Sequence, residues 1–162
     1  MSIEIREANL RDAEDGRAFL LMLSAYAEGE MGGGKPLDAD VARRLVPALL
    51  EHPGAHVLLA WDGARPVGVA TCFVGFSTFA GRPLLNVHDL SVVVEASGRG
   101  VGRALLAHAE VLARSLGCVK LSLEVLEDNA LARGLYASFG FRDYELGGVA
   151  RRTFFLTKPL EP

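Results

Sequence analysis

The stretch from residue 84 to residue 125 constrains the fold most, because it holds two predicted strands with one predicted helix between them. The apolar run Leu84–Val94 and the alternating run Val119–Val125 have the patterns of strands. Apolar residues recur on one face of the helix predicted over Arg103–Leu116. Two strands joined by a crossover helix lie parallel in one sheet, so this stretch predicts a helix packed on a sheet.

The residues before this stretch predict antiparallel strands and two more helices. The strands His56–Trp61 and Pro66–Phe76 flank a short turn, and with the strand at 84–94 they predict a meander. A further strand is predicted at Ile3–Ala8. Helices are predicted over Ala13–Glu28, capped by Asn9 or Asp12, and from Asp38 or Asp40 to Glu51, with a glycine-rich loop at 29–36 between them.

The last part of the chain predicts a short helix at Asn129–Ser138 and strands at Phe141–Tyr144 and Ala150–Leu156. The whole order predicts an α/β (α+β) fold in which helices cover both faces of a mixed, mainly antiparallel central sheet. A length of 162 residues is enough for one hydrophobic core, so we expect a single domain over residues 1–162.

Composition narrows the classes of partner. Hydrophobic residues make up 50% of the chain and charged residues 23%, which is typical of a folded globular protein. The formal net charge of −3 argues against nucleic-acid binding and slightly favours cationic or neutral small molecules. The charged N-terminus does not resemble a signal peptide, and the longest apolar run is too short to span a bilayer. We therefore expect a soluble cytoplasmic protein with no membrane partner.

The cysteines and histidines do not indicate a metal site. Cys72 and Cys118 each lie in an apolar run and are predicted to be buried, reduced thiols. The four histidines have no metal-ligand spacing with each other or with the cysteines, so we predict no bound metal.

Three glycines at alternate positions, Gly98, Gly100 and Gly102, come directly before the predicted crossover helix. Glycine weakens a regular element by about 0.5–1 kcal/mol relative to alanine, so a cluster of it suggests a special backbone requirement. Backbone N–H groups at a helix N-terminus bind anions, and Arg99 and Arg103 add positive charge. The loop therefore indicates a site for a diphosphate, and an ordinary strand-to-helix connection is the alternative.

Two other phosphate-binding loops fit the sequence less well. A Walker A loop ends in Gly-Lys-Ser/Thr, whereas Gly102 is followed by Arg103 and Ala104. A dinucleotide fingerprint needs a third glycine or alanine where this chain has Arg103 or Leu105. Oxidoreduction with a nicotinamide cofactor is therefore a weak hypothesis.

Two longer blocks resemble the GNAT superfamily of acetyl-CoA-dependent N-acetyltransferases. HDLSVVVEASGRGVGRALL at 88–106 resembles its pyrophosphate motif, with Gly100 and Gly102 at the glycine positions and Ser97 where arginine or glutamine is usual. LEVLEDNALARGLYASFGF at 123–141 resembles the second family block, with matching residues at Asn129, Leu135, Tyr136, Gly140 and Phe141. The resemblance implies the acyl-CoA N-acyltransferase fold, acetyl-CoA as cosubstrate and a homodimer, which is common among related enzymes.

The resemblance also implies roles for individual residues. The backbone of Leu90, Ser91 and Val92 is expected to pair with the pantetheine arm, and Asn129 to bond the same arm while also capping a helix. Tyr136 is expected to protonate the departing thiolate or to bond the cofactor without proton transfer. The diphosphate is expected to lie on the backbone of the loop residues Ser97, Gly98, Arg99, Gly100, Val101, Gly102 and Arg103.

His88 and Asp89 are candidates for handling the proton of the amine. The segment GFSTFAGRPLLNVHDLSV at 75–92 resembles the diamine and polyamine acetyltransferases, with His88 in place of their glutamate. A histidine titrates near neutrality and accepts a proton, whereas Asp89 attracts a cation or acts through water. Neighbours in a strand point to opposite faces, so one of the two is expected to face the cleft.

The sequence thus predicts an enzyme that transfers the acetyl group directly to a primary amine in a ternary complex. A small diamine or polyamine is the first candidate acceptor, and a protein amine or an aminoglycoside is an alternative. A regulatory module that binds acyl-CoA without catalysis is a further hypothesis, because Ser97 and His88 depart from the family pattern.

Overall fold

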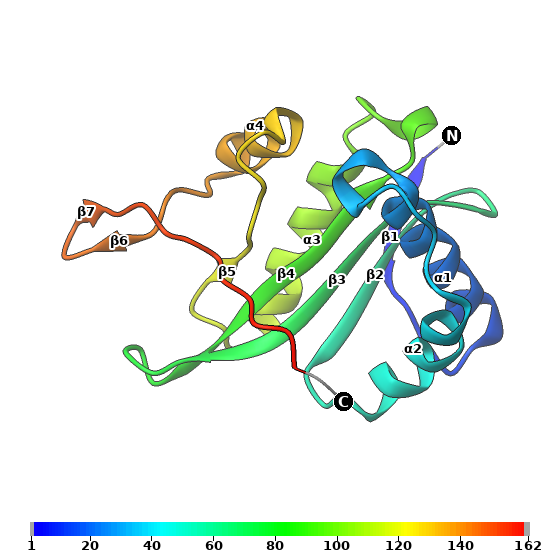
Figure 1. Cartoon of the computed structure of the whole chain (residues 1–162), viewed down its shortest axis with the longest axis horizontal. Coiled ribbons are helices and arrows are strands. Elements are labelled where there is room, and N and C mark those ends of the chain that lie inside the picture. The colour runs from blue at the N-terminus through cyan, green and yellow to red at the C-terminus, as the bar shows by residue number, and fades with distance from the viewer. Residues whose placement is uncertain (1, 161–162) are drawn as a thin grey trace. The chain divides into compact units, whose positions relative to one another are not determined.

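A five-stranded sheet in the order β1-β2-β3-β4-β5 organises the chain up to Leu123 (Figure 1). The structure is a computed structural model that describes residues 2–160. A second compact unit begins at Glu124. The strands of the sheet are β1 (Ile3–Glu7), β2 (Ala55–Asp62), β3 (Arg65–Ser77), β4 (Arg82–Val92) and β5 (Leu121–Ser122).

The pairing of these strands confirms the predicted sheet. β1 with β2, β2 with β3, and β3 with β4 are antiparallel, which is the expected meander. β4 and β5 are parallel, as a crossover connection requires. Their ladder joins just two residue pairs, Leu85 with Leu121 and Asn86 with Ser122, so β5 is much shorter than the predicted strand at 119–125.

The α-helices of the first unit begin and end close to their predicted positions. They are α1 (Ala13–Glu28), α2 (Ala39–Glu51) and α3 (Val101–Ser115). Two short 3₁₀ helices, η1 (Glu30–Gly32) and η2 (Val94–Ala96), were not predicted. The side chains of Asp12 and Asp38 accept hydrogen bonds from the first turns of α1 and α2, so these two residues, of the alternatives considered, are the caps.

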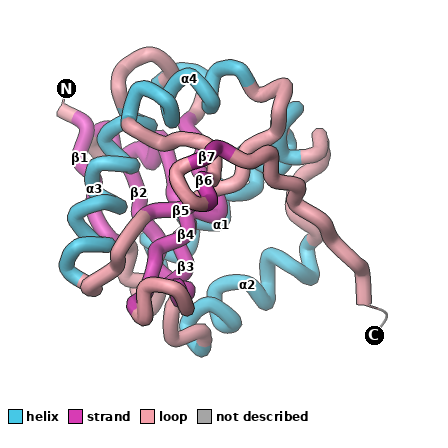
Figure 2. Tube along the Cα trace, turned by 90° about the vertical axis from the view of Figure 1, so that its left-hand side faces the viewer, coloured by secondary structure: helices cyan, strands magenta, loops and turns pink. Residues whose placement is uncertain are grey.

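Helices cover both faces of the sheet, which confirms the predicted fold class. Phe19 and Met22 of α1 pack in one buried cluster with Leu59 and Val69 of the sheet, and partly buried side chains of α2 join it. A Cβ placed on Gly68 of β3 would touch Leu105 and Val101, so α3 lies on the opposite face. In Figure 2, α3 and α2 lie on opposite sides of the strands.

The second unit consists of α4 (Ala130–Phe139) and a small hairpin, β6 (Glu145–Leu146) with β7 (Val149–Ala150). The strands predicted at Phe141–Tyr144 and Ala150–Leu156 are wrong except at Ala150. Phe154, Phe155 and Leu156 are all exposed. Their apolar character suggested a strand, but a strand also needs a neighbouring ladder for its backbone groups, and apolar character does not supply one.

The two cysteines differ in burial. Both are free thiols, as predicted, but Cys72 is buried and Cys118 is half-buried. Burial raises the pKa of the Cys72 thiol to about 12, so this sulfur stays protonated at neutral pH. Within residues 2–160, none of the helices combines the length and the apolar character needed to cross a membrane.

One ion pair fastens β1 to α1. The Arg6 guanidinium donates two hydrogen bonds to the Asp15 carboxylate, at 2.7 and 2.6 Å, and the Asn9 N–H donates a third at 2.8 Å. Asp15 is 2% exposed, and the Arg6 guanidinium also lies over the Trp61 ring at 5.1 Å. The bond from Arg6 lowers the pKa of Asp15 in spite of burial.

Replacing Asp15 by asparagine is expected to lower the free energy of unfolding at pH 7 by about 2–3 kcal/mol, because the Arg6 guanidinium loses the buried carboxylate that balances its charge. The matched control is Asp40→Asn, since exposed Asp40 pairs with Arg43 and Arg44 on the surface of α2 and such pairs contribute less than about 1 kcal/mol. Urea unfolding of the three proteins measures the difference.

Comparing wild type with Asp15→Asn at different pH values gives a second test of this ion pair. A carboxyl whose pKa is lower in the folded state stabilises the protein above its ordinary pKa, and this contribution disappears as the pH falls through the folded pKa. The gap between wild type and Asp15→Asn should therefore be constant above about pH 5 and shrink below about pH 4. A gap that widens with acid would contradict the assignment.

Candidate active site

The strand β4 contains a bulge at the predicted proton-handling residues. Thr71 of β3 lies opposite Asp89, and the next residue, Cys72, lies opposite Val87. His88 is therefore an extra residue in β4 with no partner across the ladder, which interrupts the alternation of the strand. The prediction that His88 and Asp89 point to opposite faces is wrong for this reason.

Contacts show that the two side chains share one face of the sheet. The His88 ring meets the Phe73 ring edge-on, with the centroids 5.4 Å apart. Phe73 and Thr71 are two residues apart in β3 and so share a face, and Asp89 lies directly opposite Thr71. Thr71 in turn is opposite Val57, which belongs to the cluster under α1. His88 and Asp89 therefore both lie on the α1 side.

The surroundings of Asp89 make its ionised form less favourable than it is in water. Burial is the largest influence and raises the pKa of this carboxyl, while His88 and the Thr71 hydroxyl act in the opposite direction. Thr71 Oγ1 is buried and meets no group of the described residues in hydrogen-bond geometry, so it offsets little of the cost of burial. The Asp89 charge also raises the pKa of Tyr26, near the end of α1.

An aromatic contact that the sequence did not reveal extends this site. The other neighbour of Phe73 is His52, at the end of α2, with ring centroids 5.2 Å apart. The rings of His52, Phe73 and His88 thus form a row on the face that carries Asp89. Their separation in sequence hides this row, because strand register brings Phe73 and His88 together and helix packing adds His52.

The glycine loop has the geometry of an anion cradle. Gly98 and Gly100 have φ angles of +74° and +81°, which only glycine adopts readily. Gly100 is the N-cap of α3 and no side chain caps the helix there. The first helical bond runs from Ala104 N–H to Gly100 O, so the Val101 and Gly102 N–H groups have no acceptor within the helix.

The space over this loop is open. A Cβ built on Gly98 or Gly100 would meet no atom within 4 Å. These glycines are therefore needed for their left-handed conformation and not to avoid a steric clash, and the unbonded N–H groups at the start of α3 are available to an anion. The residues present fit a diphosphate.

The loop carries two basic side chains. Arg103 is exposed in the first turn of α3. Arg99 Nη1 donates to Asp62 Oδ2 at 2.9 Å, at the end of β2. Its charge is thus already partly balanced, which the sequence did not predict, because Asp62-Gly63 indicated only a turn.

The edge of β4 next to the loop is open as well. Leu90, Ser91 and Val92 pair with β3 on one side. On the other side, the ladder with β5 ends at Asn86, and no strand of the first unit pairs with Leu90–Val92 there. An extended ligand can therefore add to this edge through backbone hydrogen bonds.

The second unit holds the remaining predicted residues. Asn129 Oδ1 accepts the Ala132 N–H at 3.1 Å, so the predicted helix cap is confirmed. Tyr136 is half-buried in α4, and its ring meets the Phe141 ring edge-on at 5.8 Å. The structure brings His88, Asp89, the β4 edge and the glycine loop into one unit, whereas the ligand roles of Tyr136 and Asn129 stay predictions.

Comparison with known families identifies the class of the protein. The model described as "Acetyltransferase (GNAT) family" matches residues 19–141. The chain belongs to the GNAT acetyltransferase family. This confirms the resemblance seen in the sequence, the enzyme class and acetyl-CoA as the cosubstrate of this acetyltransferase.

Individual proteins agree with the family match. The acetyltransferase is 27% identical over 137 residues to the uncharacterized N-acetyltransferase YhfO of Bacillus subtilis, covering 83% of this chain and 90% of that one. It is 29% identical over 150 residues to the thialysine N-epsilon-acetyltransferase of Sus scrofa, covering 88% and 85%. The solved structure of AAC(6')-Iy in complex with the bisubstrate analog CoA-S-monomethyl-acetylneamine has the same fold, with a TM-score of 0.77, 14% identity and coverage of 99% and 100%.

Asp89→Asn is expected to raise the unfolding temperature of the acetyltransferase at pH 7. Burial raises the pKa of Asp89, so the folded protein is less stable when this carboxyl is ionised, and the amide removes that cost. A group with a raised pKa contributes stability at low pH that is lost as the pH rises through the folded pKa. The gain should therefore vanish below about pH 4.

Thermal unfolding of both proteins between about pH 4 and pH 7 measures this gain. The matched comparison is Asp15→Asn, which should change the unfolding temperature in the opposite direction at pH 7. A lower unfolding temperature for Asp89→Asn at pH 7 would show that ionised Asp89 stabilises the fold.

Proposed function

We propose that this enzyme transfers the acetyl group of acetyl-CoA directly to a terminal primary amine on a flexible aliphatic chain, a diamine or polyamine being the first candidate. The observation that carries the proposal is the order of three structural features along β4 and the loop that follows it. The bulge with His88 and Asp89 is followed by the open edge at Leu90–Val92 and then by the uncapped N-terminus of α3. These features support a site in which acceptor chemistry and donor binding share one continuous segment.

In this proposal the backbone of the first unit binds the cosubstrate. The amides from Ser97 to Arg103 bind the diphosphate, aided by the dipole of α3. The edge at Leu90–Val92 pairs with the pantetheine arm in the manner of an added strand, and one of its N–H groups polarises the acetyl carbonyl. Asn129 bonds the same arm. The bound cosubstrate supplies an activated acetyl thioester.

The proposed proton path uses three side chains. Asp89 attracts the substrate ammonium, and exposed His88 beside it accepts a proton so that the neutral amine can attack. The C–N bond forms as the C–S bond breaks, and the Tyr136 hydroxyl donates a proton to the departing thiolate. The second proton that the nitrogen loses on becoming an amide restores the Tyr136 hydroxyl through water, and His88 releases its proton to solvent. His88 and Asp89 can share this work because the bulge turns both to the same face.

Three features support a cationic acceptor with a terminal amine. Asp89 adds negative charge to the site, and the exposed residues Glu28 and Glu30 add more at the end of α1. This end of α1 is near Asp89, because the Asp89 charge raises the pKa of Tyr26. The net charge of −3 favours cations over anions. One relative is named for acetylation of the epsilon nitrogen of thialysine. A protein amine and an aminoglycoside are the alternative acceptors.

We also propose that residues 1–162 form one acetyltransferase domain. The family match at 19–141 crosses the boundary between the two compact units, at Leu123 and Glu124. The homodimer and the cytoplasmic location stay predictions.

A panel of amines tests the function. Purified protein with acetyl-CoA is offered putrescine, spermidine, lysine, thialysine, a peptide N-terminus and an aminoglycoside, and the release of free thiol is recorded. The proposal expects the fastest release with the aliphatic diamines or polyamines. Binding of acetyl-CoA without thiol release from any amine would favour the non-catalytic module instead.

Tyr136→Phe then separates catalysis from binding. Loss of the proton donor is expected to lower kcat by about 10²–10⁴-fold with little change in the Kd of acetyl-CoA. The Phe141 contact needs only the ring, so the fold should be kept. Equal losses in kcat and in affinity would remove Tyr136 from the catalytic role.

Gly100→Ala tests the diphosphate cradle. At a φ of +81° an alanine costs about 1–2 kcal/mol, and relief of this strain turns the amides of the loop away from the ligand. We expect the Kd of acetyl-CoA to rise at least about tenfold, measured by calorimetry. The control is Gly117→Ala, with a φ of +71° just beyond the other end of α3 and equally open space. It should lose similar stability and keep the affinity; equal affinity losses in both variants would contradict the cradle.

A further inference from the structure

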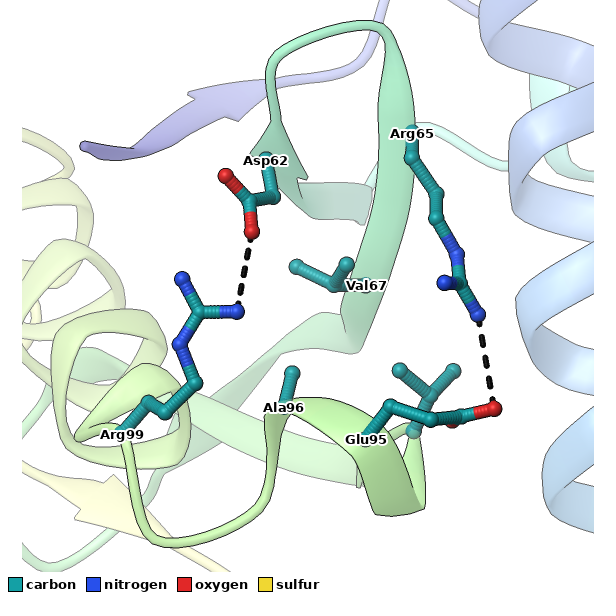
Figure 3. Close-up of a pocket in the computed structure, with 7 residues that line it drawn as sticks. Asp62, Arg65, Val67, Glu95, Ala96 and Arg99 are labelled. Carbon is teal, nitrogen blue, oxygen red and sulfur yellow. Dashed lines mark hydrogen bonds and ion pairs between the residues drawn. The ribbon is translucent and has the colours of Figure 1, made fainter. Parts of the chain in front are cut away.

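A cavity of about 260 Å³ lies beside the glycine loop, on the side of the β2–β3 hairpin (Figure 3). Val67 and Ala96 give it an apolar floor, and four charged side chains surround that floor. None of these residues has a role in the chemistry proposed above except Arg99. The cavity therefore raises the question of what its charged rim does.

The charged rim consists of two ion pairs, each between an arginine and a carboxylate. Arg99 of the loop binds Asp62 at the end of β2, at 2.9 Å, and Glu95 of η2 faces Arg65 at the start of β3, at 3.5 Å (Figure 3). Each pair joins the loop segment to one strand of the hairpin. The Arg99–Asp62 pair is the less exposed, because the Asp62 side chain is 13% exposed while Arg65 and Glu95 are 63% and 67% exposed.

Backbone hydrogen bonds hold the glycine loop mainly at its ends, where the Ser97 N–H donates to Val94 O at 3.0 Å and Gly100 O accepts the Ala104 N–H at 2.9 Å. Residues 97–100 are all exposed, and Arg99 is the one side chain between two left-handed glycines. The Arg99 N–H reaches Ala96 O at 3.4 Å, which is a long hydrogen bond. Gly98 and Gly100, on either side of Arg99, lose much conformational entropy when the loop becomes ordered. An ordered loop therefore needs an anchor outside itself.

Asp62 is well suited to be that anchor. It is the last residue of β2 and lies in register with Ile3 of β1 on one side and Arg65 of β3 on the other. Both neighbours fix its backbone. Asp62 Oδ1 is buried without a hydrogen-bond partner among the described residues, so the carboxylate makes its charged contact to Arg99 through Oδ2.

We infer that Asp62 is a positioning residue for the cosubstrate-binding loop. Through Arg99 it holds Gly98 and Gly100 in their left-handed conformations, so that the amides of the loop are arranged before the diphosphate arrives. The entropy cost of ordering the loop is then met when the protein folds, so it does not reduce the affinity for the diphosphate. This inference rests on the proposed role of the loop in binding acetyl-CoA.

The test compares Asp62→Asn with the matched control Glu95→Gln, which breaks the other ion pair of the same cavity. Calorimetry with acetyl-CoA and steady-state kinetics are measured for both variants and for wild type. Asp62→Asn should raise the Kd and the KM of acetyl-CoA about tenfold while kcat at saturation stays within about twofold. Glu95→Gln should leave all three values unchanged.

Two further variants show whether the effect passes through Arg99. Asp62→Glu keeps the charge and should recover most of the affinity. In a background of Arg99→Gln, Asp62→Asn should have no additional effect, since residues that act as a pair are not additive. An Asp62→Asn protein that binds acetyl-CoA as tightly as wild type, or more tightly, overturns the inference, as does an equal loss in Glu95→Gln.

Hydrogen exchange of the ligand-free protein keeps this test separate from the proposed function. The amides of residues 97–103 should exchange faster in Asp62→Asn than in wild type or Glu95→Gln, whether or not acetyl-CoA is the ligand. Wild-type protein that fails to bind acetyl-CoA would remove the proposed function and, with it, the role in cosubstrate binding. Unchanged exchange in the loop would remove the anchor alone.

Discussion

The pairing of β4 is the constraint on which the rest of the structure depends. On one side β4 forms a long antiparallel ladder with β3, and this ladder fixes the place of every β4 side chain. On the other side it meets β5 at two residues and then runs on unpaired to Val92. The same strand therefore carries a rigid side and an open side. The ladder on its rigid side fixes His88 and Asp89, the residues proposed to handle the acceptor, and its open side leads to the glycine loop.

Three buried or half-buried carboxylates show how surroundings assign different tasks to one residue type. Asp15 receives two bonds from Arg6 and one from a backbone amide, so its charge stabilises the junction of β1 and α1. Asp89 has burial without comparable donors, so its pKa rises and its charge destabilises the fold. A carboxylate whose burial raises its pKa and destabilises the fold is typical of functional sites. Asp62 makes one charged contact, to Arg99 of the glycine loop.

Much of the candidate site could be predicted from local sequence. The glycine loop was expected because Gly98 and Gly100 lie directly before a helix, and both indeed have positive φ. The helix caps at Asp12 and Asn129 followed from side-chain chemistry next to a helical pattern. The arrangement of His88 and Asp89 was mispredicted, because strand alternation holds only while the ladder has no bulge. Strands at 141–144 and 150–156 were mispredicted because apolar residues do not by themselves provide a pairing partner.

The sequence by itself determined the kinds and order of the main helices and strands as far as α4, the family, and the backbone conformations that need glycine. These depend on residues close together in the chain, where periodicity, capping and steric freedom act locally. Only the tertiary structure decided that His88 and Asp89 share a face, that His52 and Phe73 extend the aromatic row, and that Arg99 is held by Asp62. The contacts among them join residues 15 to 37 positions apart in the chain, and they follow from strand register and packing, which no local pattern encodes.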